Sequence, residues 1–200
     1  MTGSPIDYYF SLNSPWSYLG VGRLAAIAEA AGRLVKVFPV QSMEVFSRTG
    51  GLPLAKRAPE RQNYRLAELN RWREFLDIKL TLEPKFFPAD DSFASHAVIA
   101  ADEKGLNALK LVQEIGRAQW ELEEDFSQPD VAAAAAERAG IDMRSLGELR
   151  QYEARYKANA ELAVAKGVFG YPFYIVDGES YWGQDRLDFV ARKLGVETGA

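Results

Sequence analysis

The sequence predicts an α/β fold in which a β-α-β unit near the start and a β-β-α unit near the end are separated by a long helical segment. Three observations predict it. β-rich runs occur only towards the two ends of the chain. The helical pattern between the first two runs is long enough to join parallel strands. An Asp-Gly pair separates the last two runs, as in a tight hairpin.

The opening unit occupies residues 6 to 40. Ile6–Phe10 is a β-rich run, and Pro15 stands near the start of a helical pattern that reaches about Ala31. Gly32 is suited to end that helix, because glycine readily adopts the left-handed backbone found after a helix C-terminus. The run LVKVFPV, residues 34 to 40, follows as a second strand. Two parallel strands joined by a crossover helix are therefore expected.

The middle of the chain is predicted to be a loop followed by helices. Residues 44–58 hold two glycines and a proline, which are typical of loops. Helical patterns then cover residues 59–76, 92–104, 106–122, 129–139 and 145–167, with an irregular link at about residues 79–92. This segment shows no clear internal repeat, so it is expected to be an insertion of single helices.

The end of the chain returns to β-structure. Phe173–Val176 and Ser180–Trp182 flank Asp177-Gly178, and a closing helix follows. Together with the opening unit, this order predicts a thioredoxin-like fold interrupted by a large all-helical insertion. The expected division is a thioredoxin-like domain of residues 1–58 and 168–200 and a helical insertion domain of residues 59–167.

The composition excludes several classes of site. The 200 residues include no cysteine, so disulfides, thiolate metal sites and thiol catalysis by the protein itself are excluded. A single histidine excludes multi-histidine sites, so no metal is expected. The net charge of −4 disfavours a nucleic-acid partner. The start, MTGSPIDYYF, lacks the features of a secretory leader, and there is no long apolar run, so we expect a cytoplasmic protein without a membrane partner.

Two stretches resemble a known family. They are SPWSYL, residues 14–19, and GVFGYPFYIVDGESYWGQDRLDF, residues 167–189. With the insertion between them, they are similar to the 2-hydroxychromene-2-carboxylate isomerases, which group with kappa-class glutathione transferases and DsbA-type oxidoreductases. DsbA-type enzymes carry a Cys-x-x-Cys pair where this chain has Ser14-Pro15-Trp16-Ser17. The isomerases and kappa transferases keep a serine at the first position, and the absence of cysteine agrees with them.

The resemblance implies glutathione as cofactor and Ser14 as the catalytic residue. Ser14 would donate a hydrogen bond to the glutathione thiolate, at a helix N-terminus that favours anions. The backbone of Tyr171, before a cis Pro172, would pair with the cysteinyl backbone, and Asp185 would meet the γ-glutamyl ammonium. The glutathione-binding residues implied in this way are Ser14, Tyr171, Pro172, Trp182, Gly183, Gln184 and Asp185.

Each of these residues also has a plain structural interpretation. From the residues alone, Ser14 is favoured as an ordinary helix N-cap, worth about 1 kcal/mol. A proline before a strand is usually trans. Asp185 in a first helical turn complements the helix dipole. His96 is interpreted as a packed or surface helix residue without ligand partners, Trp72 and Trp120 as core residues, and Glu121–Asp125 as a solvated face.

The family pattern implies substrate contacts at Phe46, Lys56, Arg57 and Phe86. Cations there suit an anionic aromatic carboxylate, which guanidinium binds through two parallel hydrogen bonds. The sequence departs from the pattern at Phe46, where relatives carry a basic residue, and at Lys56 and Arg57, where they carry Asn or Arg. These departures leave the particular chromene substrate open. The two cations are equally consistent with solvated loop charges, and Phe86 with the core.

The function implied by the resemblance is glutathione-dependent isomerisation of 2-hydroxychromene-2-carboxylate-type intermediates of aromatic degradation. The alternative is a kappa-like glutathione S-transferase or peroxidase with a different electrophile. A third interpretation, a non-catalytic thioredoxin-like binding module, predicts no affinity for glutathione. The expected partners are a small aromatic carboxylate substrate and, since relatives are often dimers, a second copy of the chain.

Overall fold

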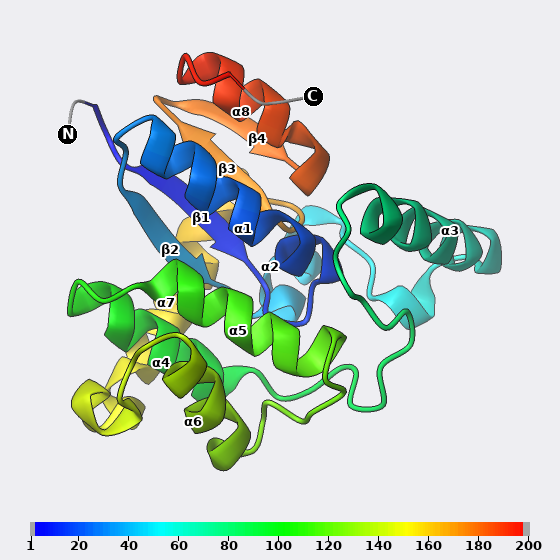
Figure 1. The fold of residues 1–200 in the computed structure, drawn as a ribbon. Helices are drawn as coiled ribbons and strands as arrows, with labels where there is room; N and C mark the ends of the chain where they lie inside the picture. Colours follow the sequence, from blue (N-terminus) through cyan, green and yellow to red (C-terminus); the bar gives the residue numbers. More distant parts are fainter. Residues whose placement is uncertain (1–2, 198–200) are drawn as a thin grey trace.

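The computed structural model describes residues 3–197 and is organised around a four-stranded mixed sheet of order β2-β1-β3-β4 (Figure 1). β1 (Ile6–Phe10) pairs in parallel with β2 (Val35–Pro39), and α1 (Pro15–Ala30) joins them. β3 (Phe173–Val176) runs antiparallel to both β1 and β4 (Glu179–Trp182). The predicted fold class, a thioredoxin-like α/β fold with a helical insertion, is confirmed.

The remaining helices follow the sheet in chain order. They are α2 (Ser42–Thr49), α3 (Pro59–Phe75), α4 (Ser92–Glu103), α5 (Ala108–Trp120), α6 (Pro129–Arg138), α7 (Glu153–Ala165) and α8 (Leu187–Lys193). Short 3₁₀ turns lie at Leu54–Lys56, Met143–Leu146, Leu149–Tyr152 and Gln184–Arg186. The helices expected at residues 59–76, 92–104, 106–122 and 129–139 are confirmed to within a few residues at each end.

Two local predictions were wrong. Residues 44–58 were expected to form a loop, but α2 covers the first part of this range because Val45 is buried and Gly50, at φ +78°, ends a helix. The single helix expected over residues 145–167 is broken. Gly147, at φ +79°, interrupts it, so two 3₁₀ turns precede α7.

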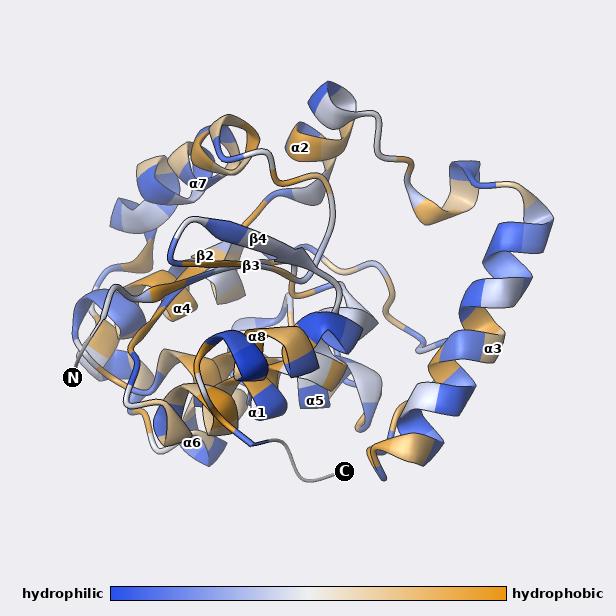
Figure 2. Cartoon of the chain, turned by 90° about the horizontal axis from the view of Figure 1, so that it is seen from above, coloured by the Kyte–Doolittle hydropathy of each residue, from blue (hydrophilic) through white to orange (hydrophobic). Residues whose placement is uncertain are grey.

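Helices cover both faces of the sheet, as Figure 2 shows from above. Alternate residues of each strand point to opposite faces. On one face, Tyr8 and Tyr174 stack at 5.4 Å between ring centroids and join the cluster that contains α1 and α8. On the other face, Tyr9 stacks on Phe38 at 4.6 Å and joins the cluster that contains buried residues of α2 and α7. The sheet is therefore the middle layer of the molecule.

The helical insertion shares its core with the sheet. The largest apolar cluster joins β1, β3, α1 and α8 with buried residues of α4, α5 and α6. α3 is attached differently and extends away from the sheet (Figure 1). Its one buried residue, Leu69, belongs to a small separate cluster with Leu19, Leu80 and Trp120. Across residues 3–197, no helix has the length and apolarity needed to cross a bilayer.

Candidate active site

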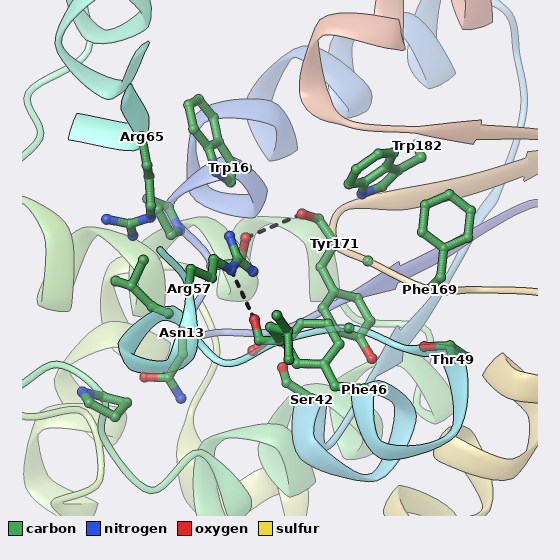
Figure 3. A pocket seen from close by; sticks show the side chains of 18 of the residues that line it. Asn13, Trp16, Ser42, Phe46, Thr49, Arg57, Arg65, Phe169, Tyr171 and Trp182 are labelled. Atoms are coloured by element: carbon green, nitrogen blue, oxygen red, sulfur yellow. Dashed lines mark hydrogen bonds between the residues drawn. The ribbon is translucent and has the colours of Figure 1, made fainter. Parts of the chain in front are cut away.

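A cavity of about 480 Å³ lies at the N-terminus of α1, within the volume range of small-molecule sites. Figure 3 shows Arg57 and Arg65 on one side of it, Trp182 and Phe169 on the other, and Tyr171 between them. Five separate segments supply the lining residues, which are Ser11, Asn13–Trp16, Ser42, Phe46, Thr49–Leu52, Leu54, Arg57, Arg61, Arg65, Phe87, Pro88, Phe169–Tyr171 and Trp182. The fold therefore gathers at one point residues that are far apart in the sequence.

Ser14 lines the cavity and is also the N-cap of α1. Its Oγ accepts a hydrogen bond from the Ser17 backbone N–H at 3.3 Å, as in an ordinary cap. The same hydroxyl donates to the Tyr171 carbonyl at 3.5 Å, a long bond that Figure 3 marks with a dashed line. The first turn of α1 holds no acidic side chain. The helix N-terminus therefore presents its partial positive charge to the cavity without a competing carboxylate.

Tyr171 presents its backbone to the same cavity. The Tyr171-Pro172 bond is cis, as the resemblance implied. Within residues 3–197, the Tyr171 backbone N–H has no hydrogen-bond partner, and its carbonyl accepts only the long bond from Ser14. A buried peptide normally has both groups paired. These open groups fit an extended peptide that adds to this segment as a strand.

The other residues expected on the glutathione side lie next to this segment. Trp182 lines the cavity and packs edge-on against Phe169, with 4.8 Å between ring centroids. Gly183, Gln184 and Asp185 are outside the lining, but the Gly183 N–H donates to the Pro172 carbonyl at 2.9 Å. This turn therefore borders the cavity behind Trp182, on the side away from the arginines.

Two of the four residues expected to contact substrate line the cavity. Phe46 packs against Tyr171, and the Arg57 Nε donates to the Leu52 carbonyl at 2.9 Å. Lys56 and Phe86 lie outside the lining. Phe86 instead carries the Lys85 ammonium over its ring at 5.0 Å, and its neighbour Phe87 reaches the cavity.

Several lining residues were not anticipated from the sequence. Asn13 is held by two 2.9 Å bonds with the backbone of Ala89, one donated and one accepted. Arg61 and Arg65 project from α3, and the Arg65 guanidinium lies 5.8 Å from the centre of the Phe87 ring. The sequence did contain a signal for Arg61 and Arg65: they are four residues apart in a predicted helix, and residues at that spacing lie on the same helix face.

The cavity is electropositive. Arg57, Arg61 and Arg65 line it, and no aspartate or glutamate within residues 3–197 does. Burial, together with repulsion from Arg57, lowers the pKa of Arg65 to about 10. Burial and the charge of Arg61 also lower the pKa of Arg57. Both guanidinium groups remain charged at neutral pH, so the cavity is suited to anions.

No cluster of three or more histidine, cysteine or acidic side chains that could hold a metal ion occurs in residues 3–197. His96 is 6% exposed and lies 3.1 Å from a Glu153 carboxylate oxygen. Its burial in α4, remote from the cavity lining, agrees with the interpretation of a packed helix residue.

Comparisons with known proteins agree with the thioredoxin-like fold. A family model described as "DSBA-like thioredoxin domain" matches residues 5–195. A 2-hydroxychromene-2-carboxylate isomerase of Sphingobium xenophagum is 28% identical over 193 residues, covering 94% of this chain and 97% of that protein. Human glutathione S-transferase kappa 1 is 24% identical over 215 residues, covering 95% and 90%. A solved 2-hydroxychromene-2-carboxylate isomerase superposes with a TM-score of 0.77 at 24% identity, covering 95% and 94%.

Proposed function

The chain belongs to the family of DSBA-like thioredoxin domains, and its relatives are enzymes, named as isomerases and as glutathione transferases. From this premise we propose that it is a glutathione-dependent isomerase of 2-hydroxychromene-2-carboxylate-type intermediates of aromatic degradation. The glutathione thiolate is held by Ser14. The names of the relatives support the cofactor and the substrate class, and the cavity supports the chemistry.

One observation carries the proposal: the Ser14 hydroxyl and the open backbone groups of Tyr171 face one electropositive cavity in a chain without cysteine. A thioredoxin-like site without its own thiol needs an external sulfur to act as a nucleophile. Glutathione fits these groups, because its cysteinyl backbone matches the unpaired N–H and weakly paired C=O of Tyr171. Its binding residues are proposed to be Ser14, Tyr171, Pro172, Trp182, Gly183, Gln184 and Asp185.

Glutathione, held by Ser14 and the backbone of Tyr171, would supply a thiolate able to add reversibly to a conjugated carbon of the acceptor and to be expelled again, so that the cofactor is regenerated. Ser14 redirects its hydroxyl proton from the Tyr171 carbonyl towards the sulfur. This costs little, since the bond it gives up spans 3.5 Å. The N-terminus of α1 stabilises the anion and lowers the thiol pKa below its usual value of about 8.5.

The substrate side orients the acceptor. Arg57, fixed by the Leu52 carbonyl, binds the substrate carboxylate. Phe46 and Trp16 flank the flat ring and keep water from the reacting carbon. Lys56 and Phe86 are not proposed as substrate contacts, since neither belongs to the cavity lining.

The alternative is a kappa-like glutathione S-transferase or peroxidase. The human kappa-class relative supports it, because it matches nearly the whole chain. The two functions share the thiolate site and differ in what happens to the sulfur. An isomerase regenerates glutathione, whereas a transferase or peroxidase consumes it.

Turnover against a trace of cofactor separates the two functions. The protein is incubated with a 2-hydroxychromene-2-carboxylate and a small molar fraction of glutathione. Conversion of many substrate equivalents per glutathione supports the isomerase. Consumption of one glutathione per product supports the transferase, and no glutathione-dependent conversion of any electrophile contradicts both. Light scattering of the purified protein checks the homodimer, which rests on resemblance alone.

A further inference from the structure

Three guanidinium groups form a stripe along the substrate side of the cavity. Arg57 follows the 3₁₀ turn before α3, and Arg61 and Arg65 lie one turn apart on α3 itself. We name Arg57, Arg61 and Arg65 the arginine stripe. Among residues 3–197, no carboxylate lies within 4.0 Å of any of their nitrogen atoms. Arg23, Arg33 and Arg138 each have such a partner, whereas Arg73, Arg150, Arg155 and Arg192 have none in the described part of the chain, so what distinguishes the stripe is the gathering of three such groups on one cavity.

Holding these charges together is unfavourable without a ligand. Like charges four residues apart on a helix repel one another. Arg61 is the third residue of α3, where the partial positive charge of the helix N-terminus also disfavours a cation. Glu60, in the same turn, forms no ion pair with the stripe. Burial, and to a smaller extent repulsion within the stripe, lower the pKa of Arg57 and Arg65. An arrangement of this kind is a preformed anion site.

The proposed cofactor accounts for one member of the stripe at most. The γ-glutamyl end of glutathione is assigned to the turn at Gly183–Asp185, beyond Trp182. Only its glycine carboxylate remains to reach an arginine. The substrate named for the isomerase relatives, a 2-hydroxychromene-2-carboxylate, carries one carboxylate group. The glycine carboxylate of glutathione and the single carboxylate of that substrate can neutralise two guanidinium groups, so one of the three has no counter-charge.

The lining next to the stripe is aromatic. The Arg65 guanidinium lies over the Phe87 ring at 5.8 Å, which aims it along the ring face and into the cavity. Trp16 and Phe46 contribute further ring surface to the same cavity. Flat apolar surfaces beside fixed, forked donors suit a planar conjugated ligand with anionic groups at its edge.

We propose that the acceptor of this enzyme is a planar conjugated compound with two carboxylates. Arg57 binds the first, as in the proposed function, and Arg61 and Arg65 together bind the second. The inference rests on the proposed function and specifies, within its substrate class, an acceptor that carries a second carboxylate. Arg61 and Arg65 then determine specificity, and a single carboxylate engages the stripe only in part.

Isothermal titration calorimetry tests this with three probes: benzoate, benzene-1,3-dicarboxylate and its neutral diamide. Each is titrated into the protein alone and into protein saturated with S-methylglutathione, which occupies the cofactor side without reacting. The dicarboxylate is expected to bind at least tenfold more tightly than benzoate, and the diamide more weakly than either. Raising the ionic strength should reduce the dicarboxylate advantage, as for any charge-driven contact.

Variants locate the effect. Arg61→Gln and Arg65→Gln are each expected to remove most of the tenfold advantage, and Arg65→Lys to retain more of it than Arg65→Gln. Arg71→Gln is the matched control, because Arg71 is on the same helix but pairs with Glu68 outside the cavity. It should leave all three affinities unchanged. Circular dichroism confirms that the variants are folded, and the Lys variant keeps the test valid if a Gln variant unfolds.

Equal affinities for benzoate and the dicarboxylate in the wild type would overturn the inference, as would an advantage that survives in the Arg61→Gln/Arg65→Gln double variant. Failure of the dicarboxylate to bind counts against it equally. The proposed function fails separately, by absence of S-methylglutathione binding or by an unshifted glutathione thiol pKa. The titrations without cofactor still test the stripe in that case.

Discussion

The Ser14 hydroxyl and the Tyr171 carbonyl are 3.5 Å apart, although 157 positions separate the two residues along the chain. This contact joins the start of α1 to the segment before β3, and it is long for a hydroxyl donor. The Ser14 Oγ also accepts the Ser17 N–H, which holds the side chain in the cap position. Ser14 is therefore positioned as a cap while its proton remains available to a ligand.

Replacing Ser14 with alanine should separate these two roles. Ser14→Ala is expected to lower kcat by roughly 10²-fold, the usual loss when one donor to a developing anion is removed. Affinity for glutathione should change little, since the backbone of Tyr171 is intact. Lost capping should cost about 1 kcal/mol of unfolding free energy. Steady-state kinetics, glutathione titration and ultraviolet absorbance of the bound thiolate against pH measure the three effects.

Asn107→Ala is the control for the capping loss. Asn107 caps α5 by accepting the Lys110 N–H at 3.0 Å and lies outside the cavity lining. It should lose a similar free energy of unfolding and keep full activity. If Ser14→Ala behaved in the same way, Ser14 would be a structural cap only. A normal thiol pKa in the wild-type complex would lead to the same conclusion.

Two glycines should separate the substrate side from the cofactor side. A Cβ at Gly51 would meet the Phe46 ring, and one at Gly170 would meet the Trp182 indole at 2.5 Å. Gly51→Ala should therefore displace Phe46 and raise KM for the acceptor several-fold, with glutathione affinity unchanged. Gly170→Ala should weaken glutathione binding by displacing Trp182. Titrations of each ligand against both variants provide the comparison.

Gly22→Ala serves as the reference for this pair. Gly22 lies in α1, and an added Cβ there would meet only the end of the Gln113 side chain, at 3.3 Å. Gly22→Ala should change neither the KM for the acceptor nor the affinity for glutathione. The division of the cavity into two sides is contradicted if Gly51→Ala and Gly170→Ala weaken both ligands to the same extent.

Asp91 should make stability depend on pH. Burial raises its pKa to about 6, although its Oδ1 accepts the Tyr156 hydroxyl at 2.7 Å. The unfolded value is about 3.9. Between these values the native state binds more protons than the unfolded state, so the free energy of unfolding falls as the pH rises through this window. Below pH 4 the carboxyl is protonated in both states and the effect is absent.

Asp91→Asn stays neutral at every pH, and its amide oxygen still accepts from Tyr156. Relative to the wild type, the variant should gain about 2 kcal/mol between pH 4 and pH 7. Urea unfolding at a series of pH values measures the difference. Burial also raises the pKa of Asp102 to about 6. Asp102 is present in both proteins, so its contribution cancels when the two stability curves are subtracted. Parallel stability curves would show that Asp91 titrates normally.

Leu69 should determine how firmly α3 holds the arginine stripe. It is the one buried residue of this helix. Leu69→Ala should cost about 2–4 kcal/mol by leaving a cavity against Leu19 and Trp120. Hydrogen exchange should accelerate in α3 more than in α1, and acceptor affinity should fall while glutathione affinity is kept. Leu66→Ala, at a half-buried position of the same helix, should cost less. Uniform acceleration along the whole chain would contradict this.

Most of the fold follows from local sequence patterns. The β-rich runs, Gly32 and the Asp177-Gly178 turn predicted the sheet and its hairpin, because period-2 patterns and turn residues are local signals. The break at Gly147 was missed because the residues on both sides of it favour helix, so the positive φ of this glycine was not evident from the sequence pattern. α2 was missed for a different reason. Its apolar contacts are made with distant parts of the chain rather than within the helix.

The site was predictable where a motif marks it. Ser14, Tyr171 and Trp182 lie in stretches that carry the resemblance, and all three line the cavity. The resemblance implied Phe86, whereas its neighbour Phe87 lines the cavity, and an irregular segment has no repeating pattern that could distinguish the two. Arg61 and Arg65 were missed because charged residues on a helix are usually solvated. Only the position of α3 beside the cavity gives them a role.

The attachment of α3 through a single buried leucine has an evolutionary consequence. The proposed cofactor side of the cavity is built on the central sheet, whereas Arg61 and Arg65 lie on a peripheral helix that has one buried residue, and Arg57 lies just before that helix. Mutations that change the specificity for carboxylate substrates can accumulate on that helix with little effect on folding or on cofactor binding. Divergence of substrate range within this family should therefore be concentrated in residues 57 to 75.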